Sequence, residues 1–384
     1  MVLDREFPPD IRVENEIEAL SEAGFEVHIA CFTKENKKKY EFSNNIHIHR
    51  KKISEIIFKT SVGCLKFPIY FNFWRSFIQG LFKKYNFKVI HIHDLPLAQI
   101  GYEFKSKYGV KFILDLHENW PAYLRMAAHT KSIFGKFLSN DSEWIRYESE
   151  MCNNADNIIT VVDEARHRLV KAGVQGKKIA VVSNTLNLTH FSLPKIKQDP
   201  NIFTIVYAGG INKHRGLQNI IRGLQFIDKG AKKLQFIILG VGSYLNELKK
   251  ISKNIGVYNM IDFIGWVPYV EMQKYILKSD LCVIPHEKND HTDSTIPHKL
   301  FQYMFAGKPV ISSNCNPITR ILNECKCGYV YKFNDPNDFA VKVSEIYNNN
   351  ELYIKMSKNG RACVENKYNW EKDKEYLLSI YKTI

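Results

Sequence analysis

Two loops in the second half of the chain combine glycines, cations and polar residues in an order that suits the binding of an anion. The first, residues 207–216, reads YAGGINKHRG and places Gly209 and Gly210 ahead of Lys213 and Arg215. Glycines let the backbone approach a ligand closely, and the amides at the start of a following helix are free to bind negative charge. The loop matches neither GxGxxG nor GxxxxGK[ST]. We therefore predict an anion-binding loop of another kind, with a glycine-rich turn carrying solvated cations as the alternative.

The second loop, residues 292–304, reads TDSTIPHKLFQYM. Ser294 or Thr295 can cap a helix that starts after the proline, and we expect this helix to begin near Lys299. Lys299 and Gln302 are three residues apart and therefore share one face of the helix. We predict that this face also meets an anion. A capped helix with solvated side chains is the alternative.

Two loops in the first half of the chain follow apolar runs and carry histidines beside carboxylates. Residues 90–96 read IHIHDLP, and residues 114–121 read LDLHENWP. A metal centre needs three or four converging ligands, and neither loop has a local ligand spacing such as HExxH. We therefore predict no metal here and expect His117 to orient a hydroxyl or share a proton near neutral pH. Hydrogen bonding within the loop is the alternative for His117 and for His93.

The elements that must hold these loops recur in two series of short β-branched runs separated by helix-length segments. We expect strands at residues 27–32, 46–49, 89–93, 112–116, 158–162 and 179–182, and again at 203–208, 234–239, 261–264, 281–285, 310–313 and 329–330. This alternation is typical of parallel sheets that bind ligands beyond the carboxyl ends of their strands. A turn around Gly240 is as consistent with ordinary structure as with a ligand contact. Two such sheets facing each other would enclose a central cleft.

A polar segment at residues 184–201, which contains Pro194 and Pro200, separates the two series and is the expected hinge. We predict one domain at residues 1–190 and a second at residues 191–367. A C-terminal helix at residues 368–384 is expected to pack back on the first domain.

The composition excludes several classes of protein. Of 384 residues, 45% are hydrophobic and 24% are charged, which is ordinary for a folded protein and not for a disordered or coiled-coil chain. The sequence shows no basic leader with an apolar core and no run of 18 apolar residues, so we expect a cytoplasmic protein that neither spans a membrane nor is secreted. The eight cysteines form no CxxC pair, and we expect buried, reduced thiols.

The chain is basic, with a net charge of +14, which favours an anionic partner. Residues 50–88 contain nine cations, one acid and ten aromatics. Cations interleaved with aromatics favour the surface of an anionic bilayer, so we predict peripheral attachment to the inner face of the membrane. A core helix with solvated lysines is the alternative. Single-stranded nucleic acid also binds such surfaces, but no RNA-binding motif is present, and we expect no nucleic-acid partner.

Residues 206–216, taken together with residues 297–310, resemble the retaining glycosyltransferases of family 4, also described as glycosyl transferases group 1. Four shorter stretches agree with the same family in the expected order: HDLP at 93–96, DLHE at 115–118, ADNIITV at 155–161 and VVSN at 181–184. Together these stretches extend over nearly the whole chain.

The resemblance implies a GT-B fold, in which two Rossmann-like, doubly wound α/β domains face a central cleft and the second holds a nucleotide-diphosphate sugar. It implies that Arg215, with Lys299 or Lys213, grips the diphosphate, so that neither a metal nor another cofactor is required. His117 matches the histidine that contacts the transferred sugar. The remaining donor contacts fall on Gly209, Gly210, Gly240, Val267, Ser294, Thr295 and Gln302, and the acceptor side on Asp94, Glu118 and Arg12.

Three features depart from the family pattern. The two glutamates of the family, eight positions apart, fall on Ser294 and Gln302, and the arginine often found after the first glycine falls on Gly210. The glycine-rich first loop is replaced by residues 7–14, FPPDIRVE. These changes bear on donor choice, activity and acceptor recognition.

The resemblance therefore implies a hexosyltransferase that moves a sugar, with retention of configuration, from a nucleotide-diphosphate sugar to a lipid-linked or glycan acceptor. Its product would be a cell-surface polysaccharide or glycolipid. One alternative is a nucleotide-sugar epimerase or hydrolase, for which Glu118 is the candidate acid/base. The other is a catalytically silent nucleotide-sugar binder, which Ser294 and Gln302 would suit.

Overall fold

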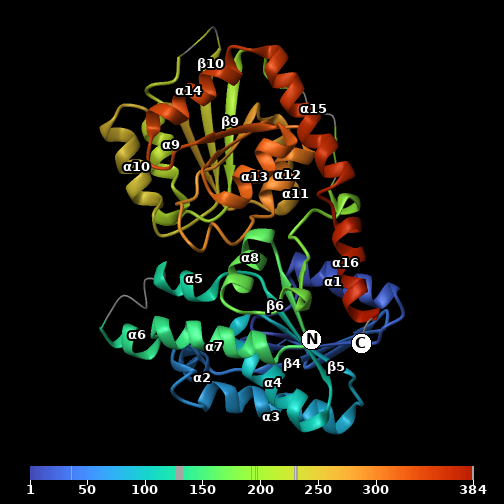
Figure 1. Ribbon diagram of the computed structural model, residues 1–384. Coiled ribbons are helices and arrows are strands. Elements are labelled where there is room, and N and C mark those ends of the chain that lie inside the picture. The colour runs from blue at the N-terminus through green and yellow to red at the C-terminus, as the bar shows by residue number, and fades with distance from the viewer. Residues whose placement is uncertain are drawn as a thin grey trace. The chain divides into compact units, whose positions relative to one another are not determined.

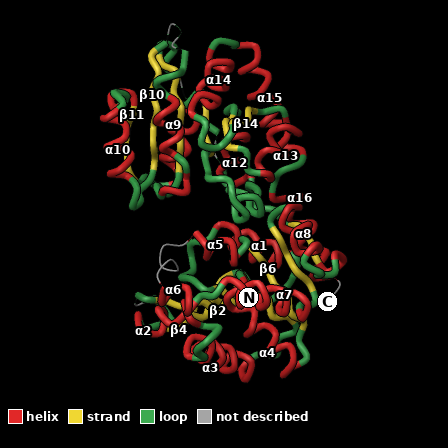
Figure 2. The backbone as a smooth tube through the Cα atoms, turned by 60° about the vertical axis from the view of Figure 1, so that its left-hand side comes forward, coloured by secondary structure: helices red, strands yellow, loops and turns green. Residues whose placement is uncertain are grey.

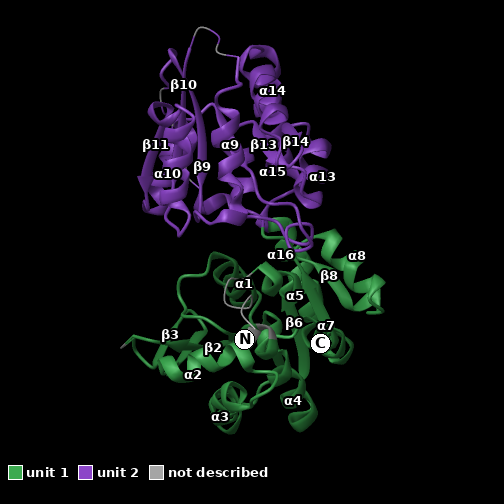
Figure 3. Cartoon of the chain, turned by 90° about the vertical axis from the view of Figure 1, so that its left-hand side faces the viewer, with its two compact units in different colours: residues 1–184, 371–384 green, residues 185–370 purple. Residues whose placement is uncertain are grey.

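The computed structural model describes residues 1–382 except 36, 127–132, 192, 195, 197, 229 and 231. The chain folds as two compact units, residues 1–184 with 371–384 and residues 185–370 (Figure 3). The second unit begins before the end of the polar segment because Leu186 pairs with Asn369, and the Leu186 carbonyl accepts a 3.0 Å hydrogen bond from the amide of Trp370.

Unit 1, most of which is coloured from blue to green in Figure 1, is built on an eight-stranded sheet. The strand order is β3-β4-β2-β1-β5-β6-β7-β8. In the described part of this sheet every neighbouring pair is parallel except β3 with β4. The order runs outward from β1 in both directions, as in doubly wound folds. The strands are β1 Val2–Leu3, β2 Val27–Thr33, β3 Tyr40–Ser43, β4 Ile46–Lys52, β5 Val89–His93, β6 Lys111–Leu116, β7 Asn157–Thr160 and β8 Ile179–Val181.

The helices of unit 1 begin where the sequence offers a cap. At α1 the Asp10 carboxylate accepts a hydrogen bond from the amide of Val13, and the Glu14 carboxylate accepts one from the amide of Asp10, so two free donors are satisfied reciprocally. The helices of this unit are α1 Ile11–Glu22, α2 Glu55–Lys59, α3 Ile69–Lys84, α4 Ala98–Tyr108, α5 Trp120–Met126, α6 Ile133–Leu138, α7 Asp141–Asn154, α8 Asp163–Lys171 and α16 Trp370–Lys382.

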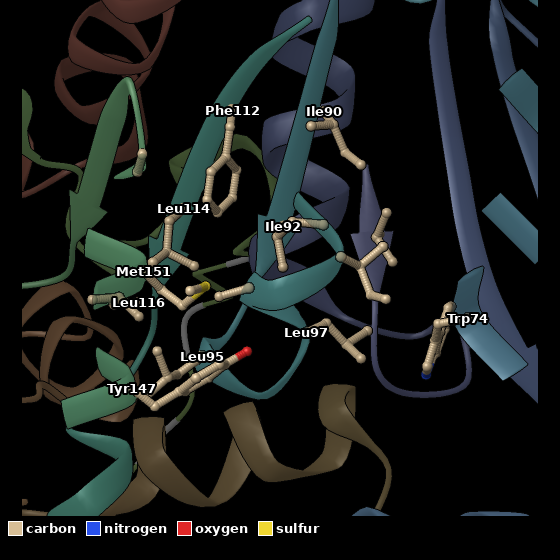
Figure 4. Packing of buried hydrophobic residues seen from close by; sticks show 14 of the residues in the cluster. Trp74, Ile90, Ile92, Leu95, Leu97, Phe112, Leu114, Leu116, Tyr147 and Met151 are labelled. Carbon is tan, nitrogen blue, oxygen red and sulfur yellow. The ribbon is translucent and has the colours of Figure 1, made fainter. Parts of the chain in front are cut away.

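One core of unit 1 lies between the central strands and the helices on one face of the sheet. Figure 4 shows side chains of β5 and β6, including Ile92 and Phe112, packed toward Tyr147 and Met151 of α7 and toward Leu97. Apolar area removed from water is the main stabilising term for such a unit. The loops at the carboxyl ends of β5 and β6 therefore stand on a rigid base.

Unit 2 is built on a six-stranded parallel sheet with the order β11-β10-β9-β12-β13-β14. This is the strand order of a Rossmann fold, and its direction reverses between β9 and β12. The strands are β9 Ile202–Ala208, β10 Lys233–Leu239, β11 Ile261–Gly265, β12 Leu281–Ile284, β13 Val310–Ser313 and β14 Gly328–Tyr331. The helices are α9 Leu217–Gly223, α10 Leu245–Asn254, α11 Tyr269–Lys278, α12 Lys299–Phe305, α13 Asn316–Cys325, α14 Pro336–Tyr347 and α15 Asn350–Asn366.

In unit 2, α9 lies beside α10 and α14, and α15 lies beside α12 and α13 (Figure 2). The prediction of two doubly wound, mostly parallel α/β units is confirmed, and each expected strand is present with shifts of at most three residues at its ends. The antiparallel edge strand β3 was not expected, because its sequence YEFS is mostly exposed and shows no apolar run.

The expectation that all cysteines are reduced is wrong for one pair. Cys325, the last residue of α13, forms a disulfide with Cys363 of α15 across a separation of 38 residues. The two helices lie beside each other, which no local spacing could indicate. The cysteines at 31, 64, 152, 282, 315 and 327 are buried free thiols.

The segment at residues 50–88 supports the core alternative for most of its aromatic residues. On α3, Tyr70, Phe71, Phe73 and Trp74 are buried, and they belong to the core of unit 1. The prediction that the aromatics of this helix face a bilayer is therefore wrong, because they supply the apolar face that packs on the sheet. Among the described residues, no helix combines the length and apolar character needed to cross a membrane.

Candidate functional site

The loops at the carboxyl ends of β9, β10 and β11 are tied together through glycines. The amide of Gly209 donates to the carbonyl of Leu239 at 2.9 Å, and the amide of Gly240 donates to the carbonyl of Gly265 at 2.7 Å. Gly240 has a φ of +134°, and a Cβ there would lie 2.0 Å from the carbonyl oxygen of Gly209. Only glycine fits this position, so the predicted glycine-rich loop is a rigid platform.

Lys299 reaches this platform from the first residue of α12. A Cβ at Gly209 would lie 2.3 Å from Lys299 Nζ, and this ammonium group lies 4.3 Å from the ring centroid of Tyr207. Burial and the nearby positive charge of Arg215 lower the pKa of Lys299 to about 7. Lys299 is therefore a poorly hydrated cation, close to its neutral form in the free protein, that an arriving anion would stabilise.

Arg215 lies on the loop before α9 and is oriented by a buried histidine. Its Nη1 donates to His286 Nε2 at 3.2 Å. Burial first, and then Arg215 and Lys299, hold the pKa of His286 well below its ordinary range, so the ring is neutral and accepts this hydrogen bond. Gly216, with a φ of +73°, turns the chain here, and a Cβ would lie 1.7 Å from the carbonyl oxygen of Pro285.

The two cations thus converge from stretches more than eighty residues apart in the chain. In the part of the chain that the structure describes, neither Arg215 nor Lys299 forms an ion pair with a carboxylate. Arg215 Nε is also buried without a hydrogen-bond partner. An arrangement of cations without a counter-charge is suited to a polyanionic ligand such as a diphosphate.

The residues at the two family glutamate positions are occupied by contacts within unit 2. The Ser294 hydroxyl donates to the carbonyl of Asp290 at 2.7 Å, and Gln302 Nε2 donates to the Tyr269 hydroxyl at 3.2 Å. Helix α12 begins at Lys299 as predicted, but its cap position is His298 and neither Ser294 nor Thr295 caps it. The predicted cap is wrong because these side chains lie in a folded loop before the helix.

Three other donor-side residues lie at loop ends of the same sheet. Gly210 accepts a 2.8 Å hydrogen bond on its carbonyl from the Tyr207 hydroxyl. Lys213 is exposed, and Val267 is half-buried beyond the end of β11, beside Trp266, of which 71% is exposed. Among the described residues, no hydrogen bond or ion pair joins the side chain of Lys213 or Val267 to Arg215 or Lys299, and their donor roles stay predictions.

In unit 1, Asp115 at the end of β6 holds a buried network. Arg12 Nη2 lies 2.9 Å from Asp115 Oδ1, Arg12 Nε lies 3.2 Å from Glu16 Oε1, and Arg12 Nη1 donates to the carbonyl of Val182 at 3.0 Å. Although burial opposes ionisation, Arg12 and His117 hold the pKa of Asp115 well below its ordinary range. Arg12 is buried and takes a structural role in this network in place of the predicted acceptor contact.

His117 is the half-buried residue that extends this network toward the loop. Its Nε2 lies 2.9 Å from Asp115 Oδ2, and its Nδ1 lies 3.6 Å from Asp94 Oδ2. Burial opposes a charged ring, but these two carboxylates prevail and raise the pKa of His117 to about 9. His117 is thus an imidazolium at neutral pH, which suits stabilising or donating to an oxygen and does not suit taking a proton.

Asp94 and Glu118 lie close to an arginine that the sequence did not single out. Arg5 Nη2 lies 3.0 Å from Asp94 Oδ2, and Glu118 contributes to the field that raises the pKa of Arg5. Glu118 is half-buried. The structure therefore brings His117, Asp94 and Glu118 together, as the two predicted loops implied.

Glu16, His91, His93 and Asp115 each offer a ligand atom within 4.8 Å of the others, which is a possible metal geometry. The guanidinium of Arg12 already contacts both carboxylates, so Arg12 supplies the positive charge that a metal ion would supply between them.

Sequence reasoning missed Glu16 and His286. His286 could have been found from its position just after the apolar run at 281–285, and Glu16 had no local signal because it lies on the face of α1 that packs inward.

Comparisons with known proteins agree with this arrangement. The family model described as Glycosyltransferase Family 4 matches residues 11–190, and the model described as Glycosyl transferases group 1 matches residues 191–362. The two matches meet near the division between the units and leave only the ends of the chain outside.

Two relatives illustrate the range of similarity. The putative colanic acid biosynthesis glycosyltransferase WcaL of Escherichia coli K12 is 22% identical over 61% of this chain and 58% of its own length. The uncharacterized glycosyltransferase MJ1178 of Methanocaldococcus jannaschii is 22% identical over 97% of this chain and 94% of its own length. The chain thus spans little more than half of WcaL but nearly all of MJ1178.

Solved structures share the fold. Sucrose-phosphate synthase from Thermosynechococcus elongatus superposes with a TM-score of 0.76 at 18% identity, covering 97% of this chain and 92% of that one. Anabaena Alr3699/HepE in complex with UDP gives a TM-score of 0.75 at 12% identity, covering 100% and 99%. With both halves matched by family models and both units built on doubly wound, mostly parallel sheets, the chain belongs to the family 4 type of GT-B glycosyltransferases.

Proposed function

We propose that the chain transfers a hexose, with retention of configuration, from a nucleotide-diphosphate sugar held by unit 2 to a lipid-linked or glycan acceptor. The observation that carries the proposal is the convergence of Arg215 and Lys299 on the glycine platform without a described carboxylate beside them. The UDP named in the Anabaena HepE complex supports a nucleotide donor, and the name of WcaL supports a product of the polysaccharide class.

Arg215 and Lys299 would stabilise the charge that develops on the departing diphosphate. As the bond between the anomeric carbon and the diphosphate oxygen breaks, both electrons of that bond leave with the diphosphate. The acceptor hydroxyl then forms the new bond on the same face of the sugar and gives its proton to a phosphate oxygen. Fixed cations in a poorly hydrated site stabilise such charge with little reorganisation, and no carboxylate at position 294 or 302 is required for this step.

His117 is proposed to contact the transferred sugar as a hydrogen-bond donor. Its two carboxylate neighbours keep it protonated, since its pKa is raised to about 9. A protonated ring can donate to a sugar hydroxyl and cannot act as the base. Asp94 and Glu118 are proposed to lie on the acceptor side, and Arg12 to act on this side only by positioning Asp115.

The test is release of nucleoside diphosphate by Arg215→Ala and Lys299→Ala, measured with and without a glycan acceptor. Each variant should lose about 2–4 kcal/mol of transition-state stabilisation, or about 30- to 1,000-fold in kcat/KM. The exposed Lys278 on α11 gives a matched control, and Lys278→Ala should retain wild-type turnover. Full turnover in either site variant would overturn the assignment.

The same assay separates the alternatives. Acceptor-dependent release supports a transferase, whereas release that ignores the acceptor and is lost in Glu118→Gln supports a hydrolase. An epimerase releases no nucleoside diphosphate and would instead convert the donor sugar into its epimer. Binding of the donor without release supports a catalytically silent binder. Ser294 and Gln302 favour this alternative because the side chain of each already makes a hydrogen bond within the protein.

We also propose that unit 1 attaches to the inner face of an anionic membrane, through a smaller surface than all of residues 50–88. Ile56, Phe67 and Ile69 are exposed by 79%, 50% and 51%, and Lys59 and Lys66 lie on the same stretch. Apolar residues flanked by cations insert shallowly into a charged bilayer. Flotation with vesicles containing anionic lipid should recover the wild type and lose Ile56→Ser/Phe67→Ser, and equal recovery of both would refute the proposal.

A further inference from the structure

Three histidines gather on one face of unit 1, at the edge of the sheet. His28 lies on β2 and pairs in register with His47 of β4, while His49 follows two residues later on the same strand. Residues paired in register, and residues two apart on a strand, point to the same face. One ring nitrogen from each histidine lies within 4.8 Å of the others.

A carboxylate supports two of these rings. Glu26 Oε1 lies 2.9 Å from His28 Nε2 and 3.1 Å from His47 Nε2, and His28 Nδ1 lies 3.0 Å from His49 Nε2. Ligand atoms around a tetrahedral zinc ion, with bonds of about 2.0–2.1 Å, are separated by roughly 3.3 Å. Glu26 contacts the nitrogen of His28 opposite the one that faces His49, so it cannot share one ion with all three rings. The rings of His28 and His47 are stacked, with centroids 4.1 Å apart and 2° between their planes, and would turn for the three nitrogens to converge on an ion.

The surroundings resemble an outer coordination shell. The Tyr40 hydroxyl lies 2.9 Å from His47 Nδ1, which orients that ring and leaves Nε2 toward Glu26. The ring of Tyr85 lies 4.4 Å from that of His28, and the ring of Phe42 lies 4.5 Å from that of His47, so aromatic rings pack beside two of the histidines.

A cavity of about 800 Å³ adjoins His28 and Glu26, and Tyr85, His91 and Tyr381 also line it. It lies at the starts of β2, β5 and β6, because Val27, Val89 and Lys111 also line it. His117 and Asp94 follow the carboxyl ends of the same strands. The histidine group is therefore at the end of the sheet opposite the predicted acceptor side.

We propose that His28, His47 and His49 bind one divalent transition-metal ion of the zinc class, and that Glu26 supports the rings of His28 and His47 from outside the ion. Three imidazoles, with a water molecule as the fourth ligand, form a nitrogen-rich set that suits zinc and does not suit magnesium. The ion would join β2 to β4 at the edge of unit 1, in a structural role separate from the sugar-transfer chemistry.

The test uses the full chain without a histidine tag, stripped with a chelator and titrated calorimetrically with ZnCl2. One zinc ion per chain should bind, and MgCl2 under the same conditions should not. His47→Gln and the nearly isosteric Glu26→Gln should weaken zinc binding at least 100-fold and at least 10-fold, respectively. His167→Gln, on an exposed residue of α8, is the matched control and should bind as the wild type does.

Zinc-edge X-ray absorption on the loaded wild type should show only nitrogen and oxygen in the coordination sphere. Sulfur in that sphere would assign the ion to a cysteine and overturn the proposal, as would the absence of binding. Wild-type affinity in a His47→Gln variant with an unchanged far-UV circular dichroism spectrum would overturn it too. Because Glu26 is on the surface, with 57% of its side chain exposed, Glu26→Gln is a second variant that is expected to fold.

Discussion

Replacing Lys299 by methionine should remove most of the activity and at the same time stabilise unit 2. Methionine keeps the length of the apolar stem and deletes the ammonium group that lies beside Gly209 and over the ring of Tyr207. Burial and the charge of Arg215 lower the pKa of Lys299 from 10.5 to about 7. The folded protein therefore holds an ammonium group that is better solvated in the unfolded chain.

The free-energy cost of burying the charged ammonium group of Lys299 follows from the difference between its pKa in the folded and in the unfolded chain. A change in pKa from 10.5 to about 7 corresponds to an upper bound of roughly 5 kcal/mol at 1.36 kcal/mol per decade. Lys299 is half-buried, and solvent screens much of this cost, so we expect a gain of about 1–2 kcal/mol. For a unit of this size that gain raises Tm by about 2–8 °C.

The pH dependence of the stability difference between the wild type and Lys299→Met shows whether the charge on Lys299 is its cause. Below pH 7 the lysine is charged in both the folded and the unfolded states, so the whole penalty is present and Lys299→Met should show its largest gain. Between pH 7 and 10.5 the folded lysine is neutral while the unfolded one is still charged, so the stability of the wild type rises with pH relative to the variant. The difference in Tm should shrink toward zero at pH 10.5.

Thermal unfolding at pH 6 and pH 9, with nucleoside diphosphate release measured in parallel, checks both halves of the prediction. Activity should fall about 30- to 1,000-fold, while Tm at pH 6 should rise. Lys278→Met, at an exposed position on α11, should change neither. A variant that keeps its turnover, or one whose Tm falls at pH 6, would refute the account of Lys299 as a poorly solvated cation reserved for an anion.

Gly216→Ala should lower the free energy of unfolding of unit 2 by at least about 3 kcal/mol in chemical denaturation, because the new Cβ would lie 1.7 Å from the carbonyl oxygen of Pro285. Gly256 has nearly the same φ, +74°, but open space around it, so Gly256→Ala should cost only about 1 kcal/mol. Similar losses for both would show that backbone strain alone acts at Gly216. Asp94→Asn should lower the NMR-measured pKa of His117 from about 9, since one of its two carboxylate neighbours is neutralised; an unchanged titration would contradict the geometry. Because the folded-state pKa of His117 is raised, its contribution to stability should be complete below about pH 6.5 and lost as the pH rises through about 9. Cys363→Ser should lower the free energy of unfolding by about 3–4 kcal/mol through loss of a cross-link that spans 38 residues, and thiol titration of the denatured, unreduced wild type should find the six free cysteines only.

The positions of the elements and of the donor-side loops could be predicted because their signals are local. An apolar run such as that of β9, followed by glycines and cations, specifies a buried parallel strand and a polar loop within about fifteen residues. The start of α12 at Lys299 was likewise readable from the proline ahead of it. The convergence of Arg215 and Lys299 was implied only by the family resemblance, and the structure supplies its geometry.

Other side chains were misjudged because their partners are distant in the sequence. Arg12 looked available to an acceptor, yet Asp115, more than a hundred residues away, binds its guanidinium. The aromatics of α3 looked like a membrane-binding face, yet they pack into the core. His286 carried no motif, yet it orients Arg215.

The amino-acid sequence by itself determined the alternation of strands and helices, the loops that carry charge, and the doubly wound class of both units, because periodicity and turn chemistry act over a few residues. Only the tertiary structure decided which of those side chains are left free for a ligand. Burial, ion pairing and the Cys325–Cys363 bond depend on contacts that the order of the strands creates across the chain, and a charge such as that of Lys299 acquires its chemistry from the groups that packing places around it.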